Sequence, residues 1–179
     1  METYIVFLRG INVSGQKKIK MLDLKSMLEK LGFDKVQTYI QSGNVVLTAI
    51  EKDAEAIELK IKSSIAKTFG YEVPVIAKSK KQIEEILERN PYKDFESLDK
   101  KGLYFVLLKN RPEEKFIKDL EAESYDNEQF SITEDCVYLL CLTGYGKAKL
   151  NNNLIERKLR VEATTRNYRT MMKLFAMAD

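Results

Sequence analysis

The order of apolar patterns in the first 78 residues allows few folds for this chain. Strand-like runs and helix-like periodicities follow one another there as strand, helix, strand, strand, helix and strand. The six predicted elements are strand 4–8, helix 21–31, strands 36–40 and 45–48, helix 53–70 and strand 72–77. This is the order of the split βαβ unit of ferredoxin-like folds. We therefore predict one such unit over residues 1–78.

Residues 79–179 carry a second, partial version of this pattern. Ser79 and Gln82 form a capping-box signature for a helix that breaks at Asn90-Pro91, and the charged stretch 92–101 is expected to be a loop. The elements predicted after it are strand 103–108, a helix with Pro112 in its first turn, strands 129–133 and 137–142, and two closing helices. The predicted fold class is α+β, with two ferredoxin-like halves, 1–78 and 79–179, packed together.

Histidine is absent from the 179 residues, and its absence excludes several kinds of chemistry. Ser-His-Asp and Cys-His nucleophile activation, His-ligated zinc and imidazole-based pH switches all require that side chain. Cys136 and Cys141 are five positions apart in a strand-like run, so they should point to opposite faces as two small buried side chains. We predict neither a cofactor nor a metal site.

Composition indicates a folded protein that does not span a membrane. The apolar fraction is 44% and the charged fraction is 32%, which is typical of a globular chain. No run approaches the roughly 18 consecutive apolar residues of a membrane span, and the N-terminus has no signal-peptide pattern. We expect a cytoplasmic protein with no membrane partner, and the pattern favours no particular oligomeric state.

Charge is unevenly distributed along the chain. The net charge is only +3, but residues 144–179 hold eight basic and three acidic side chains. Such an excess favours an anionic partner, although solvated helix faces would explain it equally well. Within this region Gly144-Tyr145-Gly146-Lys147 places two glycines beside a lysine after a predicted strand, where backbone N–H groups are able to face an anion.

Polar residues also gather in the loop after the first strand and in the turn between the second and third. The loop begins like a Walker A motif, but Gln16 and Lys17 stand where that motif needs Lys and then Ser or Thr, so it is not an NTPase P-loop. The two connections lie at the same end of a split βαβ sheet. We therefore expect one group of side chains to approach the other, namely Arg9, Asn12 and Lys18 to approach Gln41, Ser42 and Asn44. The alternative is a tight glycine-containing connection and an ordinary hairpin turn.

Three long motifs occur in order along the chain. They are Leu8–Val13, Thr38–Val46 and a C-terminal set of stretches, 146–150, 155–157 and 163–170. These resemble the hallmark stretches of the domain-of-unknown-function 1697 family, over nearly the whole chain. Ser14 departs from the glycine that the family often has there, and Tyr168 from its common tryptophan. The resemblance implies a bacterial cytoplasmic protein with two ferredoxin-like α+β halves, and it implies no agreed activity.

The motifs coincide with the three polar clusters, so we predict that they form one site. Its expected ligand-binding residues are Arg9, Asn12, Lys18, Gln41, Ser42, Asn44, Lys147, Lys149, Arg166, Asn167 and Arg169. The arginines would pair with anionic oxygens, the amides would orient the ligand, and the two C-terminal lysines would act as point charges. Glu156 is either a general base or, three residues after Asn153, a helix-capping residue.

The leading functional hypothesis is binding of a phosphate-bearing ligand, either a nucleotide or RNA. Because the predicted strand 45–48 has no aromatic residue, RNA would contact loops and C-terminal helices rather than the sheet. The first alternative is an enzyme that acts on a small anionic metabolite, with Glu156 or a tyrosine as its acid-base residue. The second is a protein-interaction module without ligand chemistry.

Overall fold

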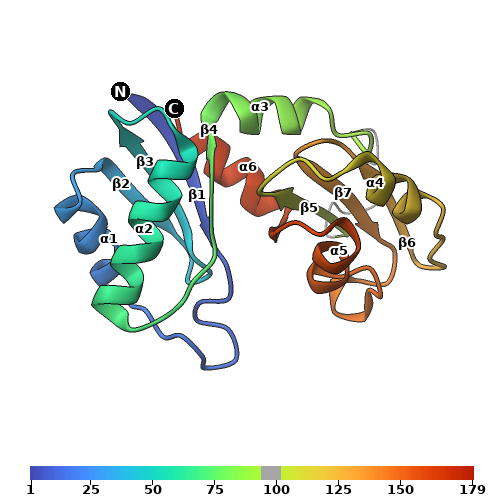
Figure 1. Cartoon of the computed structure of the whole chain (residues 1–179), viewed down its shortest axis with the longest axis horizontal. Coiled ribbons are helices and arrows are strands. Elements are labelled where there is room, and N and C mark those ends of the chain that lie inside the picture. The colour runs from blue at the N-terminus through green and yellow to red at the C-terminus, as the bar shows by residue number, and fades with distance from the viewer. Residues whose placement is uncertain (94–101) are drawn as a thin grey trace. The chain divides into compact units, whose positions relative to one another are not determined.

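The structure is a computed structural model that describes residues 1–93 and 102–179. Most of the predicted loop 92–101 therefore lies outside the described residues. The chain divides into two compact units (Figure 1). Unit 1 comprises Met1–Glu85 and Leu174–Asp179, and unit 2 comprises Ile86–Lys173. None of the described helices is long and apolar enough to cross a bilayer.

Unit 1 contains the predicted βαββαβ order. Its elements are β1 (Glu2–Leu8), α1 (Met21–Lys30), β2 (Asp34–Tyr39), β3 (Asn44–Ala49), α2 (Ala54–Phe69), β4 (Val75–Ser79) and the start of α3 (Lys80–Glu88). The sheet has the strand order β2-β3-β1-β4, and every neighbouring pair is antiparallel. Helices α1 and α2 pack against one face of this sheet (Figure 1). The α+β prediction is confirmed.

The boundaries of α2 follow from local chemistry. The Asp53 side chain accepts a hydrogen bond from the backbone N–H of Glu55, which satisfies one of the free donors at the helix start. At the other end Gly70 adopts a left-handed φ of 74°, which glycine tolerates without a steric cost. Between them Ile57, Ile61 and Ile65 recur at helical spacing and are buried in the core of unit 1.

Unit 2 is a complete second copy of this topology, which corrects the prediction of a partial one. Its elements are β5 (Leu103–Leu108), α4 (Glu114–Glu121), β6 (Glu128–Ile132), β7 (Cys136–Cys141), the 3₁₀ turn η1 (Tyr145–Lys147), α5 (Asn152–Leu159), β8 (Ala163–Asn167) and most of α6 (Tyr168–Met177). Its antiparallel sheet has the order β6-β7-β5-β8. Strand β8 was missed because its sequence, Ala-Thr-Thr-Arg-Asn, has no apolar alternation and pairs with a strand some 60 residues earlier.

Two local predictions in this part of the chain have different outcomes. The capping box is confirmed, since the Ser79 N–H donates to Gln82 Oε1 at 2.9 Å and the Gln82 N–H donates to Ser79 Oγ at 3.3 Å. Pro112 was expected inside the first turn of a helix, but α4 begins at Glu114, two residues later. Proline at this point still fits, because it lies outside the hydrogen-bonded turn.

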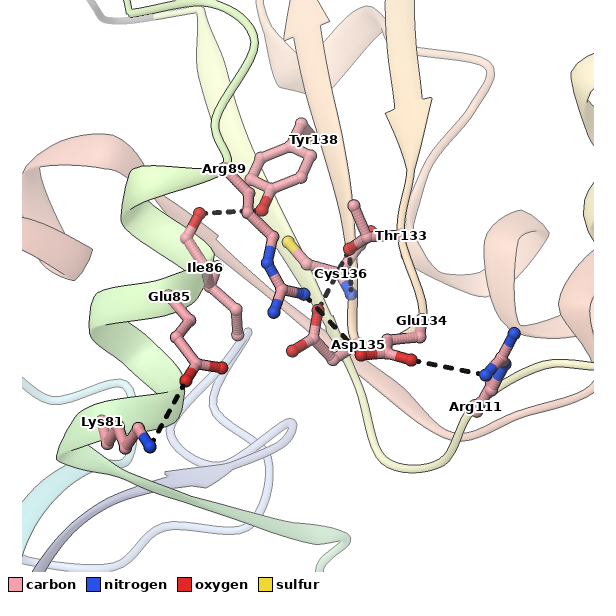
Figure 2. A network of polar contacts seen from close by, with 10 residues as sticks. All are labelled: Lys81, Glu85, Ile86, Arg89, Arg111, Thr133, Glu134, Asp135, Cys136 and Tyr138. Carbon is pink, nitrogen blue, oxygen red and sulfur yellow. Dashed lines mark hydrogen bonds and ion pairs between the residues drawn. The ribbon is translucent and has the colours of Figure 1, made fainter.

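Both faces of the unit 2 sheet are buried. One face packs against α4 and α5, and Cys141 belongs to that core. On the opposite face Tyr138 donates a 2.8 Å hydrogen bond to the carbonyl of Ile86 (Figure 2). The Phe105 ring lies 5.6 Å from the Tyr138 ring. Cys136 is two residues before Tyr138 and shares its face. The two cysteines are thus buried on opposite faces, as predicted.

Candidate functional site

The loop after β1 and the β2–β3 hairpin meet at one end of the unit 1 sheet. The Leu8 N–H donates to the Gly43 carbonyl at 2.7 Å, and the Asn12 side-chain amide donates to the Gln41 carbonyl at 2.9 Å. The backbones are so close that a Cβ on Gly43 would lie 2.6 Å from the Leu8 Cβ. The predicted approach of these two connections is confirmed.

Asn12 uses its whole side chain to hold this loop together. Its amide donates to the carbonyls of Ile19 and Gln41, each at 2.9 Å, and its Oδ1 accepts from the Ile19 N–H at 2.9 Å. The residue also has a left-handed φ of 55°, a conformation that asparagine tolerates better than most residues. Asn12 therefore acts as a structural clamp on the loop, which favours the alternative interpretation of a tight connection.

The hairpin amide is also committed to the fold. Asn44 is fully buried, and its amide donates to Ser42 Oγ at 3.0 Å and to the Tyr39 carbonyl at 3.3 Å. Lys18 and the Gln41 side chain are exposed, and Arg9 is half-buried. Of the six residues predicted in unit 1, only Asn44 is buried, and Asn12 and Ser42 are half-buried like Arg9.

A second meeting of loops occurs in unit 2, at the end of the sheet where β7 and β8 finish. Both strands are antiparallel to β5, so their C-terminal ends lie at the same edge. Tyr145 in η1, just after β7, stacks on Tyr104 of β5 with the ring centroids 4.7 Å apart. Tyr104 in turn pairs with Asn167, the last residue of β8. Residues that follow β7 and β8 are thus gathered at one end of unit 2.

A closed chain of hydrogen bonds fixes Tyr145 there. The Asn152 N–H donates to the Tyr145 hydroxyl at 3.1 Å, and that hydroxyl lies 3.3 Å from Thr165 Oγ1, to which it donates. Thr165 Oγ1 donates to Asn152 Oδ1 at 2.8 Å, and the Asn152 amide donates to the Ala163 carbonyl at 3.1 Å. The hydroxyl hydrogens of Tyr145 and Thr165 are each donated once in this network. The network therefore holds η1, α5 and β8 in a single arrangement.

Glu128 holds the segment that follows η1. This glutamate is only 6% exposed, and its two carboxylate oxygens accept from the backbone N–H groups of Lys149 and Leu150 at 3.2 and 3.4 Å. A buried carboxylate needs such donors, because its desolvation would otherwise be costly. Gly144-Tyr145-Gly146-Lys147 was singled out from the sequence, but Glu128 and Asn152 were not. Their partners are 7 to 22 positions away, at distances that no local pattern encodes.

The predicted C-terminal residues fall into different environments. Lys147, Lys149 and Arg169 are exposed at the gathered end, and Asn167 Oδ1 accepts from the Thr170 N–H at 2.8 Å as the cap of α6. Arg166 alternates with Thr165 along β8, so its side chain emerges on the opposite face of the sheet from Tyr145. There it donates to Thr164 Oγ1 at 2.8 Å and to the Thr165 carbonyl at 2.9 Å. Burial lowers the pKa of the Arg166 guanidinium to about 10.

Glu156 has a structural partner, but not the one expected. Its Oε1 accepts from the Ala163 N–H at 2.7 Å, at the start of β8. The cap of α5 is Asn151, whose side chain accepts from the Leu154 N–H at 3.1 Å, so the predicted helix-capping role of Glu156, based on a helix start at Asn153, is wrong. Two other basic residues of this region fit the alternative of ordinary helix faces. Lys158 forms an ion pair with Glu123, and Arg160 lies over the Phe116 ring at 4.4 Å.

Two hollows in the described part of the chain lie away from the predicted residues. One, of about 590 Å³, is between α1 and α2, with Asp23, Lys30, Lys67 and Phe69 in its lining. The other, of about 500 Å³, is beside β6, with Tyr92, Glu121, Tyr125 and Phe130 in its lining. Among described residues, no group of three or more Cys, Asp or Glu is placed to hold a metal ion. The predicted residues divide between units 1 and 2, so their union in one site stays a prediction.

The comparison with known families decides the identity of the chain. A family model described as protein of unknown function (DUF1697) matches residues 1–138. The chain belongs to this family. It is also similar to the solved structure of the conserved bacterial protein SP0830 from Streptococcus pneumoniae, with 25% sequence identity, a TM-score of 0.79 and coverage of 99% of both chains. No curated protein matches the chain. The resemblance read from the motifs is thus confirmed.

Proposed function

We propose that this protein binds a phosphate-bearing ligand, a nucleotide or RNA, at the end of unit 2 where β7 and β8 finish. The cations of this surface, which we call the basic end, are Lys147, Lys149 and Arg169. All three side chains are exposed. The observation that carries the proposal is that η1, the start of α5 and strand β8, which are separated in sequence, are tied together here through Tyr145.

The backbone at the basic end is fixed before any ligand arrives. Tyr145 is held by its hydroxyl contacts, and the N–H groups of Lys149 and Leu150 are held by the buried Glu128. A preformed arrangement reduces the entropy lost on binding. The lysines keep mobile side chains on this rigid base, which suits recognition of phosphate as a point charge.

The approach to this backbone is open. Gly144 has a φ of 87°, and a Cβ on Gly144 or Gly146 would meet no atom within 4 Å. A phosphate could therefore reach the main chain beside Lys147 without displacing a side chain. Asn167 exposes part of its amide next to Arg169, and Arg166 contributes structurally through its bonds to β8.

Acid-base catalysis has less support than binding. Glu156, the candidate general base, uses a carboxylate oxygen to hold the Ala163 N–H. The three cations of the basic end are exposed to solvent, which is typical of an open surface. Enclosure and a free acid-base group are what an enzyme acting on a small metabolite would need. The proposal therefore keeps to binding.

The test is binding of a labelled oligouridylate and of nucleotides by the full chain at several salt concentrations. The triple variant Lys147→Ala, Lys149→Ala, Arg169→Ala should bind at least about ten-fold more weakly, and its salt slope should fall by about 2, as expected for three lost phosphate contacts to a single strand. The matched control, Lys30→Ala, Lys52→Ala, Lys67→Ala, removes three exposed lysines of unit 1. Equal affinity of the two triple variants would contradict the proposal.

A further inference from the structure

We infer that the ligand of the basic end is single-stranded nucleic acid, and that one of its bases stacks on Tyr145. This inference rests on the proposed function and adds the chemical group that Tyr145 would recognise. A phosphate site needs only cations and N–H donors, so an aromatic ring among them calls for a separate explanation.

The ring is placed as a stacking platform. One side of Tyr145 rests on Tyr104, with centroids 4.7 Å apart and planes at 30°. Tyr145 is half-buried: it packs against the core of unit 2 and keeps part of its surface accessible. Gly144 and Gly146 on either side carry no side chain that would cover its ring, and a Cβ on either glycine would meet no atom beyond its chain neighbours within 4 Å.

The hydroxyl of Tyr145 keeps the ring in one orientation. It accepts from the Asn152 N–H and donates to Thr165 Oγ1, so rotation of the ring would break two hydrogen bonds. An aromatic side chain that is already immobile loses little entropy when a base stacks on it. Bases of every type have a π face, so stacking of this kind tolerates any sequence.

The arrangement of the cations favours a strand over a free nucleotide. Lys147 and Lys149 follow Tyr145 at intervals of two residues, and Arg169 lies at the same end of the sheet after β8. All three side chains are exposed to solvent. Cations spread over an open surface can contact successive phosphates, whereas a mononucleotide offers only one phosphate group or chain.

The first experiment needs no variant. Affinity of the full chain is measured for an oligouridylate of about ten nucleotides, for an abasic oligonucleotide of the same length, and for uridine monophosphate. We expect the oligouridylate to bind about 5- to 150-fold more tightly than the abasic strand, which is the range for loss of one stacked base. Equal affinity for the two strands would overturn the inference. Binding of the mononucleotide as tight as that of the oligomer would overturn its single-strand part.

The second experiment separates the ring from the hydroxyl. Tyr145→Phe and Tyr145→Leu both lose the hydrogen bonds to Asn152 and Thr165, and Tyr145→Leu also loses the stack on Tyr104, so the abasic strand serves as the control for any general disturbance of the site. Only Tyr145→Leu loses the aromatic face. We expect Tyr145→Leu to lose about 5- to 150-fold in affinity for oligouridylate relative to Tyr145→Phe, with no difference for the abasic strand.

The outcomes distinguish this inference from the proposed function. If Tyr145→Leu and Tyr145→Phe bind oligouridylate equally while the triple lysine and arginine variant still loses affinity, stacking is wrong and the phosphate site stands. If the parent protein binds neither strand nor the mononucleotide, the proposed function is wrong and the inference falls with it.

Discussion

Gly43 and Gly10 have the same backbone conformation in different surroundings. Both have a φ of 74°, a backbone conformation in which a residue with a Cβ is strained. A Cβ on Gly43 would lie 2.6 Å from the Leu8 Cβ and 2.9 Å from the Leu8 carbonyl oxygen, whereas a Cβ on Gly10 would meet nothing within 4 Å. The close approach of two backbones, and not the turn alone, is what requires glycine in the Ser42-Gly43 turn.

We expect Gly43→Ala to cost about 3 kcal/mol of unfolding free energy and Gly10→Ala about 1 kcal/mol. The larger figure adds a backbone clash to the strain that both variants share. Urea unfolding followed by circular dichroism measures the difference. Similar losses for the two variants would show that the contact with Leu8 is unimportant.

Asn12 combines a conformational role with a hydrogen-bonding role, and two substitutions separate them. Asn12→Ala loses three hydrogen bonds and places alanine at a φ of 55°, so it should cost about 2–4 kcal/mol. Asn12→Gly loses the same bonds but removes the strain, and it should recover about 1 kcal/mol. Thermal unfolding of both variants tests this order, and the reverse order would refute the clamp.

The last strand of each sheet is protected by the helix that precedes it. Glu58 of α2 accepts from the Ala77 N–H of β4 at 2.8 Å, and Glu156 of α5 accepts from the Ala163 N–H of β8 at 2.7 Å. Both β4 and β8 are edge strands. An edge strand has N–H groups that point away from the sheet and are able to pair with another chain. A carboxylate that accepts a hydrogen bond from such an N–H blocks this pairing. Both units thus use the same device on the last strand of the sheet.

Substitution of either glutamate tests this device. Glu156→Gln retains an oxygen acceptor and should change stability little, whereas Glu156→Ala should cost about 1.5–3 kcal/mol, the range for a hydrogen bond to a charged group. The same pair of substitutions at Glu58 should behave alike. Unfolding free energies provide the comparison. A large loss in Glu156→Gln would mean that the charge, and not the hydrogen bond, is what matters.

Helix α6 belongs to both units, so its substitutions should act on different parts of the molecule. Met171 and Leu174 are both fully buried, but Met171 belongs to unit 2 and Leu174 to unit 1. Each change to alanine should cost about 2–5 kcal/mol. We expect hydrogen exchange to accelerate mainly in unit 2 for Met171→Ala and mainly in unit 1 for Leu174→Ala. Acceleration of the same unit in both variants would contradict the division.

Buried acidic groups make the whole molecule sensitive to alkali. Burial raises the pKa of the Cys141 thiol from 9.0 to about 11, and burial followed by the charge of Glu2 raises that of Tyr4 to about 12. The unfolded chain loses these protons at lower pH than the folded chain. The unfolding free energy should therefore be intact below pH 9 and fall as the pH rises from 9 towards 12.

A pH series of thermal midpoints tests this expectation, and Cys141→Ala is its control. In that variant the thermal midpoint should no longer show the fall that the thiol causes between pH 9 and 11. The fall that Tyr4 causes between pH 10 and 12 should remain. With no histidine in the chain, the midpoint should show no imidazole titration near neutral pH. An unchanged slope in Cys141→Ala would show that the pKa of this thiol is the same in the folded and unfolded chain.

Features that depend on neighbours in the chain could be read from the amino-acid order. Asp53 and Gly70 mark the ends of α2, and Ser79 with Gln82 marks the start of α3, because each acts on backbone groups within a few residues. The alternation of strands and helices then left one topology for unit 1. The strand order of this topology decides which connections lie at the same end of the sheet, and it therefore predicted that Asn12 lies near Gln41.

Features that depend on distant partners appeared only in three dimensions. Strand β8 is polar and exists because β5 supplies its hydrogen bonds, while Glu156 holds the Ala163 N–H at the start of that strand. Asn12 and Asn44 look in the sequence like donors for a ligand, but the folded backbone consumes their amides. A polar side chain has the same chemistry whether its partner is a ligand or a carbonyl of its own chain. Only the position of that partner in the fold decides between them.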